Sequence, residues 1–167
     1  CSTWTSLSSA MKIFAVGNNF FGDDGVGSVV LDRIGEENLF PGAETFDAHT
    51  DALSLLDRFA PDELNVIIDA AEMGLEPGSV VGFAPDEVKM RIKSDHLSMH
   101  GFGLAETFAM AKQVGVLPER VVILGVEPAE IKIDRGLSDV VTAAIPDVLA
   151  LIQAEVENDV AADHPRH

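Results

Sequence analysis

A short apolar run followed directly by a glycine-rich loop constrains the fold of this chain more than any other feature. The run is Met11–Val16, the loop extends from Gly17 to Gly27, and apolar residues with helical spacing follow. A strand, a loop and a helix in this order are typical of α/β proteins, which place ligand sites at the carboxyl ends of strands. Most such loops bind phosphate through backbone N–H groups. Here the loop carries two adjacent carboxylates, Asp23 and Asp24, which repel phosphate and favour a cation.

The alternation of strand and helix patterns continues along the chain and predicts the fold class. We expect one three-layer α/β domain with a mostly parallel, twisted sheet of about five strands and helices on both faces. The expected strands are 11–16, 43–48, 64–68, 79–83 and 120–126. The expected helices are 24–37, 52–59 after a cap at Thr50-Asp51, a short turn from Pro85, 104–114 closed by Gly115, and 138–156 with a kink or restart at Pro146.

The limits of the periodic pattern predict the domain boundaries. The domain is expected to cover residues 11–157. Residues 1–10 lack the charged start and apolar core of a signal peptide, so we expect a disordered extension there. Residues 158–167 are polar and without periodicity, which indicates a flexible tail.

Composition excludes several classes of partner. The 167 residues include 28 Asp and Glu against 11 Lys and Arg, which argues against nucleic acid and against an anionic membrane surface. No apolar run approaches the roughly 18–20 residues of a membrane span. The single cysteine allows no disulfide within the chain and no thiolate metal cluster, which favours a cytoplasmic location.

Three polar positions are expected at the carboxyl edge of the sheet. Asp24 follows the first strand, Asp69 ends the third, and His100 precedes the helix before the fifth. Two carboxylates and one imidazole suit nickel, zinc or manganese better than calcium. The sequence therefore predicts a site for a transition ion.

Each of these residues also has a structural alternative. Asp24 could interact with a helix dipole, Asp69 could cap a loop, and Asp23 is expected to cap the helix rather than to bind metal. His96 could share a helical face with His100, although we expect it in a loop. Weaker candidates at the same edge are His49 and the pair Glu127-Pro128.

Familiar catalytic and nucleotide-binding motifs do not fit. The chain has no Gly-x-Ser-x-Gly elbow, and its only cysteine, Cys1, lies outside the periodic pattern, which argues against serine and cysteine hydrolases. No Lys-Ser/Thr follows the loop, as a Walker motif requires. The glycine spacing also misses the dinucleotide fingerprint, although Asp47 lies where a ribose-binding acid would be expected.

The motifs and their order resemble those of the hydrogenase maturation endopeptidases over roughly residues 11–155. The matching stretches are Gly17-Asn18-x-x-x-Gly22-Asp23-Asp24-Gly25-x-Gly27, Asp69-Ala70, Gly74-x-x-Pro77-Gly78, His100-x-x-Gly103-Leu104 and Leu124-Gly125-Val126-x-Pro128.

The resemblance implies a function that composition alone does not indicate. Members of this family remove a C-terminal extension from the large subunit of nickel–iron hydrogenases after nickel insertion. Their metal-contacting positions match Asp24, Asp69 and His100, which we take as the catalytic and metal-binding residues. His100 fits better than His96 because its distance to the next helix matches the family pattern. The nickel is expected to arrive with the precursor, so the free enzyme would hold no stable metal.

Two other functions remain compatible with the residues. One is a non-enzymatic α/β module that binds a nucleotide or a metal. The other is a metallohydrolase with its own tightly bound zinc. Metal content and cleavage of a hydrogenase precursor distinguish them.

Overall fold

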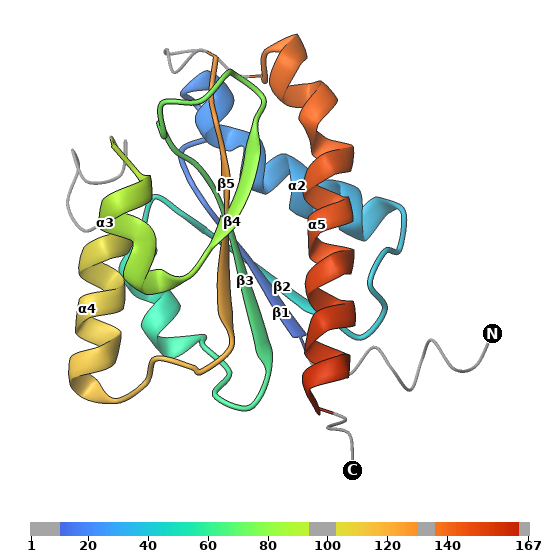
Figure 1. Ribbon diagram of the computed structural model, residues 1–167. Helices are drawn as coiled ribbons and strands as arrows, with labels where there is room; N and C mark the ends of the chain where they lie inside the picture. Colours follow the sequence, from blue (N-terminus) through green and yellow to red (C-terminus); the bar gives the residue numbers. More distant parts are fainter. Residues whose placement is uncertain (1–10, 94–102, 130–135, 164–167) are drawn as a thin grey trace.

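A twisted five-stranded sheet forms the centre of the structure, a computed structural model that describes residues 11–93, 103–129 and 136–163 (Figure 1). The strand order is β2-β1-β3-β5-β4. All neighbouring pairs are parallel except β4 and β5, which are antiparallel. The expected mostly parallel sheet is thus confirmed. The strands are β1 Met11–Val16, β2 Glu44–His49, β3 Leu64–Ala70, β4 Val80–Phe83 and β5 Val121–Val126.

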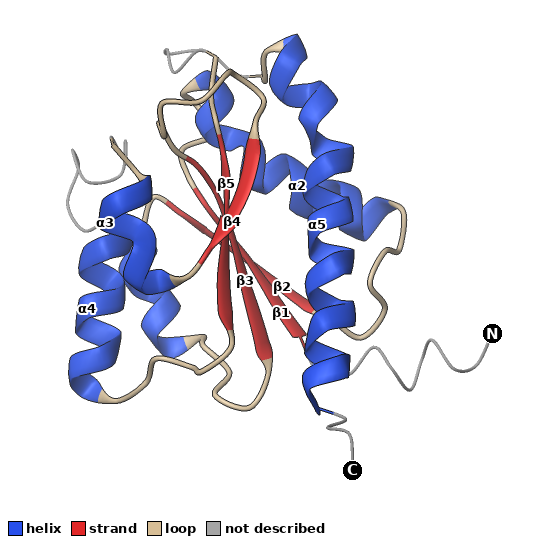
Figure 2. Cartoon of the chain, in the orientation of Figure 1, coloured by secondary structure: helices blue, strands red, loops and turns tan. Residues whose placement is uncertain are grey.

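Helices cover both faces of this sheet, which gives the three expected layers (Figure 2). One face packs against α2 (Val26–Glu36) and α5 (Asp139–Asp163). The other face packs against η2 (Ala52–Asp57), α3 (Val88–Arg91) and α4 (Leu104–Val114). Two further short 3-10 helices are η1 (Gly22–Gly25), which precedes α2, and η3 (Pro85–Glu87), which precedes α3.

The central strand β3 explains why the sheet needs both helical layers. All seven of its residues are buried, because side chains alternate between the two faces and each face has a cover. Ile68 lies in the core beside α2 and α5, while Ile67 lies in the core beside η2 and α4. Burial of each such side chain contributes about 1.5–3 kcal/mol to folding.

The first and second expected helices differ in detail from the prediction. The turn that carries Asp24 is the 3-10 helix η1, and the α-helix begins only at Val26. The segment after Asp51 is also a 3-10 helix, and the Asp51 side chain makes no capping hydrogen bond. The expected cap at Thr50-Asp51 is therefore wrong in its chemistry, although a helical turn does begin there.

The last helix is longer than expected and does not restart at Pro146. It continues to Asp163, beyond the predicted boundary at residue 157. Pro146 removes one backbone donor, but its ring lies on the exposed side of the helix. Packing of the buried side on the sheet stabilises the continuous helix. The fully buried residues of that side are Val141, Ile145, Val148 and Ile152.

Among the described residues, none of the helices combines the length and the apolar composition that a membrane crossing requires.

Candidate functional site

The loop after β1 folds around the carboxylate of Asp24. The backbone N–H of Asn18 donates to Asp24 Oδ2 over 2.7 Å. Two backbone bonds of 3.1 Å, from Phe21 N to Asn18 O and from Asp24 N to Phe21 O, close the turn. Asp24 is only 1% exposed. The loop thus holds this carboxylate in one orientation at the first turn of η1.

Gly17 makes this tight turn possible. Its φ angle is +146°, a conformation that residues with side chains rarely adopt. A Cβ atom added there would lie 2.0 Å from the carbonyl oxygen of Asp24. The N–H of Gly17 donates to the carbonyl of His49 over 2.8 Å, which ties the loop to the end of β2.

Asp23 supports a different part of the structure. Its carboxylate accepts hydrogen bonds from Ala129 N (2.8 Å), Ser138 N (2.7 Å) and Ser138 Oγ (2.9 Å). The N-cap positions of η1 and α2 are Phe21 and Gly25. The expectation that Asp23 caps its own helix is therefore wrong: it joins the loop to the segment after β5 and to the start of α5.

Asp69 lies inside β3 rather than in the loop that follows it. Its register partner on β5 is Gly125, and it is fully buried. Its neighbours two positions away, Ile67 and Ala71, belong to the core on the α3 and α4 side. Because side chains alternate along a strand, Asp69 lies on that face as well.

The structure brings Asp24 and Asp69 to the same edge of the sheet. The link is Gly27, at the start of α2, where an added Cβ atom would lie 2.9 Å from the carbonyl oxygen of Ile68. Asp24 is three residues before Gly27, and Asp69 directly follows Ile68. The close packing of α2 on β3 thus places both carboxylates at the carboxyl end of the strands, as the sequence predicted.

The third predicted ligand, His100, lies outside the described residues, as does the alternative His96. Within the ranges 11–93, 103–129 and 136–163, no group of three or more His, Cys, Asp or Glu side chains is placed to hold a metal ion. The described part of the predicted site is therefore its pair of carboxylates. His100 therefore remains a predicted ligand that rests on the sequence pattern alone.

Glu127 has a structural role at the edge of the site. It is 7% exposed, and its Oε1 accepts hydrogen bonds from Met73 N (2.8 Å) and Leu75 N (3.2 Å). These bonds hold the segment that leaves β3 after Asp69. The sequence left open whether Glu127 lines the edge of the site or turns the chain, and in the structure its carboxylate binds backbone donors of the segment after β3.

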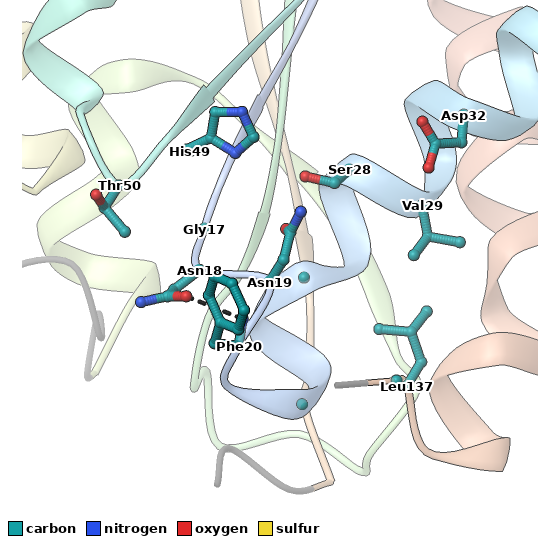
Figure 3. Close-up of a pocket in the computed structure, with 13 residues that line it drawn as sticks. Gly17, Asn18, Asn19, Phe20, Ser28, Val29, Asp32, His49, Thr50 and Leu137 are labelled. Carbon is teal, nitrogen blue, oxygen red and sulfur yellow. Dashed lines mark hydrogen bonds between the residues drawn. The ribbon is translucent and has the colours of Figure 1, made fainter. Parts of the chain in front are cut away.

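A cavity of about 540 Å³ lies beside the loop (Figure 3). It is lined by His49 from the end of β2, by Ser28 from α2, and by Asn19 and Phe20 from the loop. The remaining lining residues are Gly17, Asn18, Gly22, Gly25, Val29, Asp32, Thr50, Gly136 and Leu137.

Asp47 connects two of these lining residues. One oxygen, Oδ2, accepts a hydrogen bond from Ser28 Oγ, and the other, Oδ1, accepts one from His49 N over 2.9 Å. By its place in the sequence Asp47 matches only the position of a ribose-binding acid, and nothing there links it to Ser28. No local pattern pairs these residues, since they are 19 positions apart and meet only when β2 packs beside α2.

Chemically, the site offers two buried carboxylates at one edge of a sheet. Burying a negative charge is costly unless cations or hydrogen-bond donors offset it. Carboxylates at such an edge are suited to contacting a divalent ion or to accepting a proton from water.

The chain matches the family model of hydrogenase maturation proteases over residues 30–155. It is 28% identical to the hydrogenase expression/formation protein HupM of Azotobacter chroococcum over 152 residues, which cover 90% of this chain and 73% of that protein. It is 27% identical to the hydrogenase expression/formation protein HupD of Rhodobacter capsulatus over 121 residues. That match covers 72% of this chain and 58% of the relative, so the chain spans little more than half of that protein.

Solved structures share the fold. The hydrogenase-maturating endopeptidase HybD of Escherichia coli superposes with a TM-score of 0.76 at 22% identity, covering 90% of this chain and 93% of that one. The [NiFe] hydrogenase maturation protease HybD of Thermococcus kodakarensis gives a TM-score of 0.67 at 26% identity, covering 87% and 97%.

Proposed function

The chain belongs to the hydrogenase maturation protease family, a family of peptidases, and on that premise we propose that it removes the C-terminal extension of a nickel–iron hydrogenase large-subunit precursor. The observation that carries this proposal is the pair of buried carboxylates, Asp24 and Asp69, at one edge of the sheet. Membership of a protease family also disfavours the alternative of a non-enzymatic binding module.

The nickel in this proposal belongs to the substrate. Asp24, Asp69 and His100 would complete the coordination of an ion that the precursor already holds. Carboxylate and imidazole donors suit nickel, and a cation at this edge would offset the cost of burying two carboxylates. A precursor without nickel would lack this anchor, so binding would discriminate against it.

The bound ion would supply Lewis-acid chemistry, by polarising the scissile carbonyl or by lowering the pKa of a water. The residues of this chain orient the reacting groups. Asp24, held by the N–H of Asn18, keeps one orientation toward the substrate. Alternatively, Asp24 or Asp69 accepts the proton of the attacking water as a general base.

We place this activity in the cytoplasm. The support is compositional: the sequence holds one cysteine and no possible internal disulfide, as is usual in a reducing compartment.

The decisive experiment incubates the purified protein with a hydrogenase large-subunit precursor, in nickel-loaded and nickel-free forms. We expect cleavage of the nickel-loaded form only, with one C-terminal peptide released and identified by mass spectrometry. An uncleaved nickel-loaded precursor would overturn the proposed function. Cleavage of both forms at the same rate would overturn only the role of nickel.

Metal analysis of freshly purified protein separates the remaining alternative, a hydrolase with resident zinc. We expect well under one equivalent of any transition metal per chain. One tightly held equivalent of zinc, whose removal abolishes cleavage, would favour the zinc hydrolase instead.

A further inference from the structure

The cavity beside the glycine loop is not used by the proposed metal contacts. Its volume of about 540 Å³ falls within the range of ligand pockets. One of its walls is the loop of Gly17, Asn18, Gly22 and Gly25, which also carries Asp24. The cavity therefore adjoins the loop that carries one of the proposed metal contacts.

His49 has an unusual backbone conformation at this cavity. Its φ angle is +54°, in the left-handed region, which costs a residue with a side chain about 1–2 kcal/mol. This conformation directs its carbonyl to the N–H of Gly17 over 2.8 Å. Glycine would make the same backbone bond without the strain. A histidine held in this conformation at the wall of a cavity is a candidate for a functional side chain.

Packing in the core does not explain the presence of the His49 side chain, since this side chain is 64% exposed. Together with Ser28 it lines the cavity (Figure 3). Its Nδ1 lies 3.5 Å from Asp47 Oδ1, and the hydroxyl of Ser28 bonds to the other oxygen of Asp47. Nδ1 thus lies on the side of Asp47, and Nε2 is the ring nitrogen farther from that carboxylate.

The charge of the cavity narrows the choice of occupant. Its lining, within the described part of the chain, contains no lysine or arginine, and it includes the carboxylate of Asp32. Among the described lining residues, no lysine or arginine would therefore pair with an anionic ligand. Phe20, 55% exposed, together with Val29 and Leu137, offers apolar surface instead. Polar backbone groups beside apolar side chains match a segment of polypeptide.

We propose that His49 is a substrate-binding residue: the cavity receives the precursor segment adjoining the scissile bond, and Nε2 of His49 hydrogen-bonds to its main chain. This inference rests on the proposed function. It assigns to the cavity wall that carries His49 the role of holding the peptide, while Asp24 and Asp69 contact the metal.

Three substitutions of His49 test the inference without threatening the fold. His49→Gly and His49→Asn both tolerate the left-handed backbone. The asparagine amide reaches only as far as Nδ1, whereas the longer amide of His49→Gln reaches the position of Nε2.

The expected effect is on KM for the nickel-loaded precursor. Loss of the hydrogen bond from Nε2 to the peptide should raise KM about tenfold in the Gly and Asn variants, with kcat within about twofold of wild type. His49→Gln should recover part of that loss.

Thr45→Ala is the matched control, because Thr45 is exposed on the same strand and does not line the cavity. It should leave KM unchanged, and thermal unfolding should show that all four variants are folded. If the wild type cleaves and His49→Gly keeps its KM, the role of His49 is overturned while the proposed function stands. A fall in kcat alone, with KM unchanged, also contradicts a binding role. If the wild type cleaves no precursor, the proposed function itself fails.

Discussion

At the scale of single residues, Gly17 and Asp24 determine the geometry of the site. Gly17 has no side chain, and the backbone carbonyl of Asp24 fills the space that a side chain would take. The Asn18 N–H next to Gly17 holds the Asp24 carboxylate. Backbone conformation and chemistry are thus coupled within eight residues of sequence.

Gly17→Ala should disturb both the backbone conformation of the loop and the position of the Asp24 carboxylate. A Cβ atom 2.0 Å from a carbonyl oxygen forces the loop to move, so we expect a loss of about 2–4 kcal/mol in the free energy of unfolding. Urea denaturation measures it. Gly35→Ala is the control, because no atom lies within 4 Å of an added Cβ there and α2 should gain about 0.5–1 kcal/mol. Equal effects of the two substitutions would contradict this account.

Asp24→Asn and Asp69→Asn should each abolish processing while the protein stays folded. Both substitutions keep the size of the side chain and remove its charge, so an ion loses one anionic donor; we expect a fall of at least about 100-fold in the rate of precursor cleavage. A gel-shift assay with nickel-loaded precursor measures it. Asp57→Asn, at an exposed position of η2, serves as the control. Near-normal cleavage by both variants would remove these residues from the site.

At the scale of elements, Asp23 connects parts of the chain that are more than 100 residues apart. Its three hydrogen bonds to Ala129 and Ser138 join the loop before α2 to the start of α5. Ser138 Oγ in turn lies 3.4 Å from Val141 N, in the first turn of α5. The two helices on this face of the sheet thus begin from one shared cluster of polar groups.

Asp23→Ala should loosen that connection. Three donors to a buried carboxylate lose their acceptor, and we expect destabilisation of about 2–4 kcal/mol. Hydrogen exchange should show the amides of Ala129 and Ser138 losing protection before the rest of the domain. Thr142→Ala removes an exposed hydroxyl bond one turn further along and should have a small effect. Unchanged protection in Asp23→Ala would contradict the connecting role.

At the scale of the whole molecule, the sheet divides the apolar residues into two cores. β1, β3 and β5 are the inner strands, while β2 and β4 are the edges. The functional edge of the sheet is therefore built on its most buried strands, since Asp69 lies in β3 and the Asp24 loop follows β1. A rigid base of this kind suits a site that must hold two carboxylates in place.

Native-state hydrogen exchange should distinguish the inner strands from the edge strands. Amides of β3 and β5, paired on both sides, should open only with global unfolding, whereas amides of β2 should exchange at a lower free energy of opening. The measurement compares the opening free energies residue by residue. Protection in β2 equal to that in β3 would contradict the prediction.

The sequence by itself determined the fold class and the positions of the two carboxylates. Apolar runs and helical periodicity depend on near neighbours in the chain, so the five strands and the edge that carries Asp24 and Asp69 followed from local patterns. Helix details were less predictable: the 3-10 form of η1 and the continuation of α5 past Pro146 depend on packing against the sheet.

Only the tertiary structure decided what the neighbouring polar residues do. Asp23 was expected to cap its own helix but bonds to Ser138, 115 positions away. Glu127 holds Met73, and Asp47 links Ser28 to His49. Hydrogen bonds of this kind join side chains that are distant in sequence, and their partners are set by how strands and helices pack. A carboxylate's position can be predicted from local sequence, but its partner is known only once the chain is folded.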